Sequence, residues 1–517
     1  MDNKTLLAIV LSIAVILGYQ FLMVKEQPPV PQQQKQTETG EAAHETAKKE
    51  AVAKPKPAPT PVAVEPVAPA EEKEVRVENS LYSAVLSSRG ATIKFWKMKD
   101  YRDKKGDPVV LLQKPGVVPA LAIGSNTDFN LANANFSVSS GDLRLDDHNR
   151  FGSVVFEYAK NGISVKRTYT FHAGTYEVDV ADQVSGLPDY WITVGSDFGI
   201  FDKEASYAHA GLVLLYGTKL DELKHKKLKE PQVFKSDLRW IAQEDKYFCA
   251  ALVPETKVQE ARAWLDKDSA IIAFKGGNTV NKFRLYAGPK VQERLEKIGL
   301  QDIIDYGFFA IIARPLFWVL KFFYGFLGNY GWAIILLTLV VRIPFLPLVS
   351  RGQRSMKKLQ ELQPKMSEIK EKYKKDPQKM QKEMMELYKK HKVNPMGGCL
   401  PMVAQIPVFF ALYKVLLISI ELRGAPFMLW ITDLSAKDPY YILPIVMGVS
   451  MFVQQKMTPS GMDPKQQKLM LLMPVVFTFM FMNFASGLVL YWLVNNLLSI
   501  IQQFFINRKI AQQKATA

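Results

Sequence analysis

The sequence predicts an α-helical membrane protein with six transmembrane helices, a large β-sandwich domain outside the membrane and a charged helical hairpin. Three observations lead to this fold class. Long apolar runs recur from residue 330 onward and once near the start, short β-branched and aromatic stretches fill the region between, and a basic segment with helical periodicity follows the second apolar run. The net charge of +16 lies mostly beside the apolar runs, which favours a membrane surface over nucleic acid.

The first 75 residues predict a membrane anchor and a tether. The apolar segment Leu6 to Val24 is longer than the core of a signal peptide, and no small-residue cleavage pattern follows it. We therefore interpret residues 1–25 as an uncleaved transmembrane anchor. Residues 26–75 carry nine of the thirty prolines and no aromatic residue, a composition typical of a disordered linker.

Residues 76–290 predict the β-sandwich domain. Turn signals at Asn161-Gly162 and at residues 172–174 separate short strands. The Gly-Gly pair at residues 276 and 277 predicts a further hairpin, in which residues 271–274 pair with residues 282–286. The six histidines are scattered, and no phosphate loop, dinucleotide fingerprint or nucleophile elbow is present. We expect no metal, no cofactor and no enzymatic activity.

Residues 291–328 predict a linker and an interfacial amphipathic helix. Arg314 and Lys321 interrupt the aromatic run from Phe308 to Leu327, and a helix in the headgroup region suits these charges better than a span. The second transmembrane helix follows at residues 329–349.

Residues 350–398 predict a charged helical hairpin with fourteen basic and six acidic residues. Asp376-Pro377 forms a helix start, with an N-cap residue before a proline at the first helical position. Apolar residues recur every three or four positions on both arms, among them Met356, Met366 and Met384.

Residues 399–507 contain transmembrane helices three to six, and residues 508–517 form a short tail. The excess of Lys and Arg marks the hairpin, the loop near residues 457–468 and the tail as cytoplasmic. The acidic loop from Glu421 to Pro439 then faces outward. With six spans, both termini are cytoplasmic and the sandwich lies on the outer side.

Arg342 is the main candidate for function because it lies within an apolar run, where a charge costs about 2.5–3.5 kcal/mol on insertion scales. Thr338 lies one turn earlier on the same face. The other spans contribute polar residues such as Gln405 and Asn495 but no deep acidic partner. We therefore expect Arg342 to line a groove that water reaches.

Methionines gather in the same part of the chain, since sixteen of nineteen lie from Met356 onward. Flexible thioether side chains suit promiscuous apolar contacts, although lipid-facing filler is an equal alternative. Met402, Met470 and Met473 are candidates for apolar substrate contacts.

Four motifs resemble those of the YidC/Oxa/Alb family of membrane protein insertases, and the anchor and outer domain resemble its YidC branch in Gram-negative bacteria. The motifs are Glu383 to Tyr413, Ala425 to Leu434 (APFMLWITDL), Asp438 to Pro444 (DPYYILP) and Ser486 to Trp492 (SGLVLYW). In the outer domain, Trp240-Ile-Ala and Lys246-Tyr-Phe248 carry the likeness.

The resemblance implies a five-helix insertase core with a hydrophilic groove that is open to the cytoplasm and to lipid. It places the groove residues at Arg342, Thr338, Gln405 and Trp492, to which we add Asn495. It further implies a bacterial inner membrane location with a periplasmic outer domain. The implied partners are nascent membrane proteins, membrane lipids and the Sec translocon, with ribosomes and the signal recognition particle system at the hairpin, and no specificity for nucleic acid.

Two other classes of protein remain open from the residues alone. A solute transporter or channel would use Arg342 as an anion site, although the sequence lacks an inverted repeat. A binder of sugars or peptides would use the outer sandwich, with the spans as an anchor.

Overall fold

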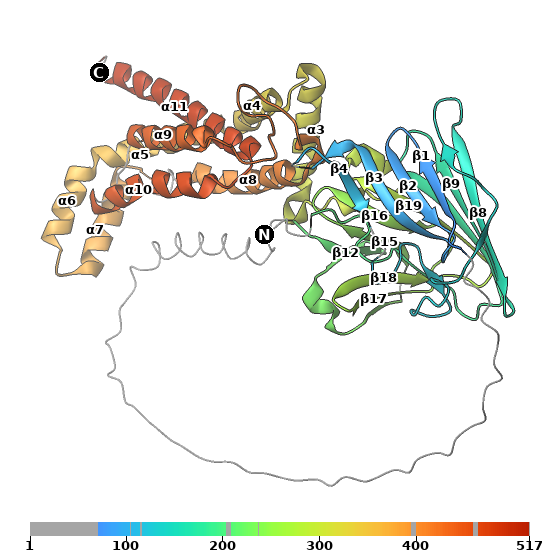
Figure 1. The fold of residues 1–517 in the computed structure, drawn as a ribbon. Coiled ribbons are helices and arrows are strands. Elements are labelled where there is room, and N and C mark those ends of the chain that lie inside the picture. The colour runs from blue at the N-terminus through green and yellow to red at the C-terminus, as the bar shows by residue number, and fades with distance from the viewer. Residues whose placement is uncertain are drawn as a thin grey trace, which may run out of the picture.

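The computed structural model describes residues 71–103, 105–113, 116–202, 208–235, 237–393, 400–458 and 464–515. Figure 1 shows a β-rich part, residues 74–289, beside a helical part, residues 292–515. The anchor expected at residues 1–25 and almost all of the linker lie outside the described residues, as does the end of the hairpin at residues 394–398.

The β-rich part contains three sheets. The first has the order β4-β3-β2-β1-β7, the second β13-β12-β15-β16-β19-β10-β9-β8-β6 and the third β14-β17-β18-β11-β5. Almost all printed pairings are antiparallel, and β1 with β7 is the parallel one. The strands are β1 (Glu74–Glu78), β2 (Tyr82–Ser87), β3 (Thr92–Arg102), β4 (Pro108–Leu112), β5 (Ile123–Gly124), β6 (Ser137–Val138), β7 (Leu143–Arg144), β8 (Phe151–Lys160), β9 (Ile163–His172), β10 (Glu177–Ser185), β11 (Trp191–Thr193), β12 (Gly211–Tyr216), β13 (Lys219–Leu223), β14 (Gln232–Phe234), β15 (Leu238–Glu244), β16 (Phe248–Pro254), β17 (Glu260–Asp266), β18 (Ser269–Lys275) and β19 (Val280–Pro289).

One predicted hairpin is confirmed and another is wrong. Strands β8 and β9 pair across Asn161-Gly162, where both residues have the positive φ that a tight two-residue turn requires. The hairpin predicted across Gly276-Gly277 does not form, because β18 pairs with β17 and β11 whereas β19 pairs with β10 and β16. Asn281 exchanges two hydrogen bonds with Gly277. These bonds fix the connection between β18 and β19, which passes from the third sheet to the second.

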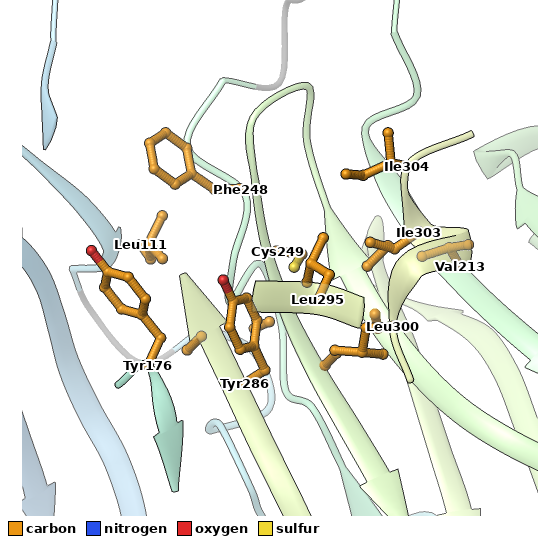
Figure 2. Packing of buried hydrophobic residues seen from close by; sticks show 14 of the residues in the cluster. Leu111, Tyr176, Val213, Phe248, Cys249, Tyr286, Leu295, Leu300, Ile303 and Ile304 are labelled. Carbon is orange, nitrogen blue, oxygen red and sulfur yellow. The ribbon is translucent and has the colours of Figure 1, made fainter. Parts of the chain in front are cut away.

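The β-rich part ends in a short helix that seals its core toward the membrane helices. Leu295 of α2 (Gln292–Lys297) is fully buried, and Leu300, Ile303 and Ile304 continue the contact with the second sheet. Figure 2 shows these side chains packed with Val213, Cys249 and Tyr286. The apolar packing joins the sheet firmly to the segment that enters the membrane part.

Within the described residues of the helical part, three helices are long and apolar enough to cross a bilayer: Gly307–Leu327, Tyr330–Glu361 and Ser486–Arg508. Three shorter apolar helices accompany them. The elements are η2 (Gln301–Ile303), η3 (Gly307–Phe309), α3 (Ala310–Leu327), α4 (Tyr330–Arg342), η4 (Ile343–Phe345), α5 (Leu346–Glu361), α6 (Gln363–Lys372), α7 (Pro377–Lys390), α8 (Leu400–Ile418), η6 (Ile420–Leu422), α9 (Ile442–Met457), α10 (Pro464–Phe481) and α11 (Ser486–Ala515), and a further short helix, η1 (His225–Lys229), lies in the β-rich part.

Helix α3 has one packed face and one open face. Ala313, Leu316, Phe317 and Leu320 are buried, whereas Ile311, Trp318, Phe322 and Phe326 are exposed. Its two charges meet acids of the preceding segment, with Arg314 3.2 Å from Asp302 and Lys321 2.5 Å from Glu293. Figure 1 draws α3 across the direction of α8 and α10 rather than along it.

The charged hairpin has three helices, α5, α6 and α7, where two arms were predicted. The first arm divides at Leu362, because Pro364 follows as an early residue of α6 and cannot donate a backbone hydrogen bond. The side chain of Asp376 accepts a hydrogen bond of 3.0 Å from the Lys379 amide, so the predicted helix start is confirmed. Met366 is buried between the arms, with Met356 and Met384 packed around it.

Candidate functional site

Arg342 is the last residue of α4, and the local sequence explains this position. The side chain of Asn329 accepts hydrogen bonds from the amides of Gly331 and Trp332 and so starts the helix. The helix ends at Arg342 because Pro344 lacks an amide hydrogen, and a short 3₁₀ turn, η4, leads into α5. The apolar run from Tyr330 to Val349 is therefore helical throughout, with a 3₁₀ turn directly after the arginine, and the Arg342 side chain meets the neighbouring helix α11.

The guanidinium of Arg342 is held by α11. Nη1 donates to the backbone carbonyl of Asn495 at 3.0 Å and to the Asn495 side-chain oxygen, while Nη2 donates to Ser499 Oγ at 2.8 Å and Gln502 Oε1 at 3.3 Å. The side chain is 8 % exposed. Among the described residues these acceptors are all neutral, so the positive charge is not neutralised, and the buried Nε has no hydrogen-bond partner there.

Asn495 brings three of the predicted residues together. Its side-chain oxygen accepts from Arg342 on α4 and, at 3.3 Å, from Gln405 Nε2 on α8. Thr338 is buried, and its hydroxyl donates to the Ile334 carbonyl of its own helix at 2.6 Å. The site therefore joins α4, α8 and α11, with Thr338 on the arginine's face of α4 but directed into its own backbone.

Trp492 occupies an aromatic cluster rather than the polar cluster. Its ring lies 4.9 Å from Phe409, 6.2 Å from Phe477 and 5.3 Å from Phe481, centroid to centroid. The cluster ties α11 to α8 and α10. On α11, this aromatic cluster thus lies about one helical turn from Asn495, which accepts the hydrogen bonds of Arg342.

Ser499 and Gln502 were missed as candidates, although the sequence contains a signal for them. Asn495, Ser499 and Gln502 follow the spacing i, i+4, i+7, which places them on one face of a helix. Gln502 also donates to the Leu346 carbonyl at 3.4 Å and to Ser350 Oγ at 3.3 Å. This one amide therefore connects Arg342 to the first turn of the hairpin helix α5.

Two of the three predicted methionine contacts can be placed. Met470 and Met473 on α10 are 38 % and 42 % exposed and belong to an open apolar face with Leu472, Val475 and Val476. The side chain of Met402 lies outside the part that the structure describes. The same helix, α10, also carries Phe477 and Phe481, whose rings lie against Trp492.

Comparison with known proteins gives the same account for both parts of the chain. Residues 322–514 match the family of the 60Kd inner membrane protein, and residues 74–319 match the YidC periplasmic domain. The membrane protein insertase YidC of Citrifermentans bemidjiense is 41% identical over 99% of this chain and 100% of its own length. That of Geobacter metallireducens is 41% identical over the full length of both. A crystal structure of an active YidC insertase covers 84% of this chain and 92% of its own, with 21% identity and a TM-score of 0.38.

These matches define a class of protein, the membrane protein insertases, which are not enzymes. Within that class the chain belongs to the YidC family, as a multi-pass membrane protein with a β-rich periplasmic domain. The family assignment favours the insertase over the transporter and over the outer-face binding protein.

Proposed function

We propose that this insertase moves nascent transmembrane segments from the cytoplasm into the inner membrane through a hydrophilic groove that contains Arg342. The observation that carries the proposal is the buried guanidinium, whose acceptors in the described part of the chain are all neutral. The insertase works alone or beside the Sec translocon. The groove is lined by Arg342, Thr338, Gln405 and Asn495, with Trp492 at its apolar border.

Exchange of hydrogen bonds gives a mechanism. The amide and hydroxyl oxygens of α11 hold the arginine at rest, and each such bond, having a charged donor, contributes about 1.5–3 kcal/mol net. A carboxylate in an acidic segment of the nascent chain offers a stronger acceptor at the same place, because both partners are then charged. The segment therefore replaces Ser499 and Gln502 as the partner of Arg342, and its apolar remainder moves into lipid along α8 and α10, past Met402, Met470 and Met473.

The arrangement in the membrane follows from charge. Six spans, counted from residues 1–25 to α11, leave both termini and the basic hairpin cytoplasmic, by the excess of Lys and Arg on that side. Ribosomes and the signal recognition particle system are the proposed partners of the hairpin. Helix α3 is the interfacial helix, because Arg314 and Lys321 pair with Asp302 and Glu293, just after the periplasmic domain.

The test compares substrates that differ only in the polarity of the translocated segment. We expect Arg342→Ala to slow insertion of a single-span substrate with an acidic segment by roughly tenfold, equivalent to about 1.4 kcal/mol. Insertion of a substrate with a neutral segment slows much less. Insertion is measured by protease protection in proteoliposomes at matched protein levels.

The matched control is Arg351→Ala, which removes an exposed arginine from α5. Equal insertion of both substrates by Arg342→Ala and the parent would overturn the role of the charge. Crosslinks from residues 338 and 492 to a stalled nascent chain test the groove itself.

A further inference from the structure

Arg423 extends from the periplasmic connection between α8 and α9 into the β-rich domain. Its Nη2 donates to the Arg102 carbonyl at 2.9 Å. Its guanidinium carbon lies 5.7 Å from the ring centre of Phe201, 5.4 Å from that of Tyr247 and 5.1 Å from that of Phe248. Three aromatic rings and one carbonyl of the β-rich domain thus surround a single arginine of the membrane part.

The three rings form an aromatic seat, and one buried carboxylate holds the backbone that carries them. Asp245 is 1 % exposed, and its Oδ2 accepts from the amides of Phe201 and Asp202 at 2.8 Å. Its Oδ1 accepts from the amides of Tyr247 and Phe248, also at 2.8 Å. One carboxylate therefore fixes both loops that carry the rings, and Figure 2 shows Phe248 at the edge of the packed core beside Leu111.

The segment that carries Arg423 also covers the outer ends of two membrane helices. The Phe427 ring lies against Gly331 so closely that a Cβ there would stand 1.9 Å from it, and the Phe427 carbonyl accepts from Asn329 at 2.9 Å. At α11, the amides of Ser486 and Gly487 donate to the carbonyls of Ala436 and Leu434. The segment is thus bonded to the starts of both helices, α4 and α11, that hold the Arg342 site.

We infer that Arg423 clamps the periplasmic domain to the segment 420–438, and that the clamp holds this segment as a cap on the outer ends of α4 and α11. The Lys246-Tyr-Phe248 motif, which has no part in the groove, supplies two rings of the seat. The periplasmic domain then acts as a brace for the membrane helices, and Asp245 is a positioning residue for that brace. The clamp does not depend on Arg342, so the clamp and the proposed insertion path can each fail without the other.

Hydrogen–deuterium exchange of the full chain in lipid nanodiscs tests the clamp. We expect Arg423→Ala to speed exchange about tenfold in two places, the segment 422–434 and the seat amides of residues 201, 202, 247 and 248. The strands β9 and β10 keep their parental rates, because they lie away from the seat. Lys437→Ala is the matched control, since it removes an exposed lysine from the same connection.

Phe201→Ala provides a second route to the same answer, because Phe201 is 36 % exposed and its loss leaves the core intact. We expect its effect on the segment 422–434 to resemble that of Arg423→Ala, and the double variant to show no further rise. Parental exchange in the segment after either substitution, additive effects in the double variant, or an equal rise in Lys437→Ala would each overturn the clamp.

Discussion

The periplasmic domain and the membrane bundle each bury an arginine, and they treat the charge differently. Arg167 on β9 is fully buried, and its Nε and Nη2 donate to the two carboxylate oxygens of Asp182 at 2.7 and 2.6 Å. Its Nη1 donates to the Leu121 carbonyl at 2.6 Å. Arg342 is nearly as buried, yet the acceptors that the structure gives it are neutral.

The difference separates a structural charge from a functional one. A bidentate ion pair compensates the charge of Arg167 and fixes its geometry, so little electric field reaches the surroundings. Neutral acceptors bind the two terminal nitrogens of Arg342 without cancelling the charge, and in a low-dielectric setting that charge continues to attract anionic groups. The pair in the periplasmic domain therefore stabilises the fold, while the bundle keeps a charge available for exchange.

The largest expected effect comes from breaking the compensated pair. Asp182→Asn leaves the Arg167 charge buried without its counter-charge, and we expect a loss of about 3–5 kcal/mol in the free energy of unfolding of the periplasmic domain. For a domain of this size the midpoint of thermal unfolding falls by roughly 10 °C. Circular dichroism of the β-rich signal in the purified full chain measures the shift.

Asp179→Asn serves as the control, since Asp179 is half exposed and its contacts with His172 and Arg284 lie at the surface. Its effect on the midpoint stays small. An equal loss in the two variants would show that burial of the pair does not distinguish Arg167 from a surface arginine.

The sequence predicted the parts of this comparison that depend on local pattern. Arg342 was found from its place in an apolar run, and Asp376 and Asn161-Gly162 from helix-start and turn chemistry. The hairpin expected between residues 271–274 and 282–286 had the same kind of local signal and is wrong. Strand β18 instead forms a tight hairpin with the preceding strand β17, while β19 joins the second sheet between β16 and β10.

Long-range contacts of single side chains could not be predicted. Nothing in the sequence joins Arg423 to Phe201, Tyr247 and Phe248, which lie some 170 to 220 positions away and meet it only in the folded chain. Ser499 and Gln502 had a helical spacing in common with Asn495, but which face of α11 meets α4 depends on the packing of the whole bundle.

A substitution with a smaller expected effect tests the position of the Arg342 guanidinium separately from its charge. Gln502→Leu removes one acceptor of Arg342 and the two bonds to α5, so we expect a loss of about 1 kcal/mol in stability. Insertion of an acidic-segment substrate stays close to parental, because the charge and the bonds to Asn495 and Ser499 remain. Thermal unfolding and protease-protected insertion are measured on the same preparation.

The control for this variant is Gln360→Leu, which makes the same change at an exposed position of α5. An insertion defect in Gln502→Leu as deep as that of Arg342→Ala would mean that the fixed position of the guanidinium matters more than its uncompensated charge.

Glu421 extends the comparison to a partly buried acid in the connection between α8 and α9, outside the membrane-spanning segments. Its Oε1 is buried without a hydrogen-bond partner among the described residues, and burial raises the pKa of the carboxyl above its usual 4.5. Lys321 opposes this shift only in part. The ionised form is therefore disfavoured in the folded protein relative to the unfolded chain.

The smallest expected effect follows from the sign of that shift. A carboxyl whose pKa is raised on folding contributes its stability below the unfolded value of 4.5 and loses it as the pH rises through the raised value. Glu421→Gln, which mimics the protonated form, should therefore raise the thermal midpoint slightly at neutral pH and leave it unchanged below pH 4.5. Unfolding curves recorded across this range would contradict the assignment if the gain grew toward low pH, since that direction requires an acid stabilised by a counter-charge.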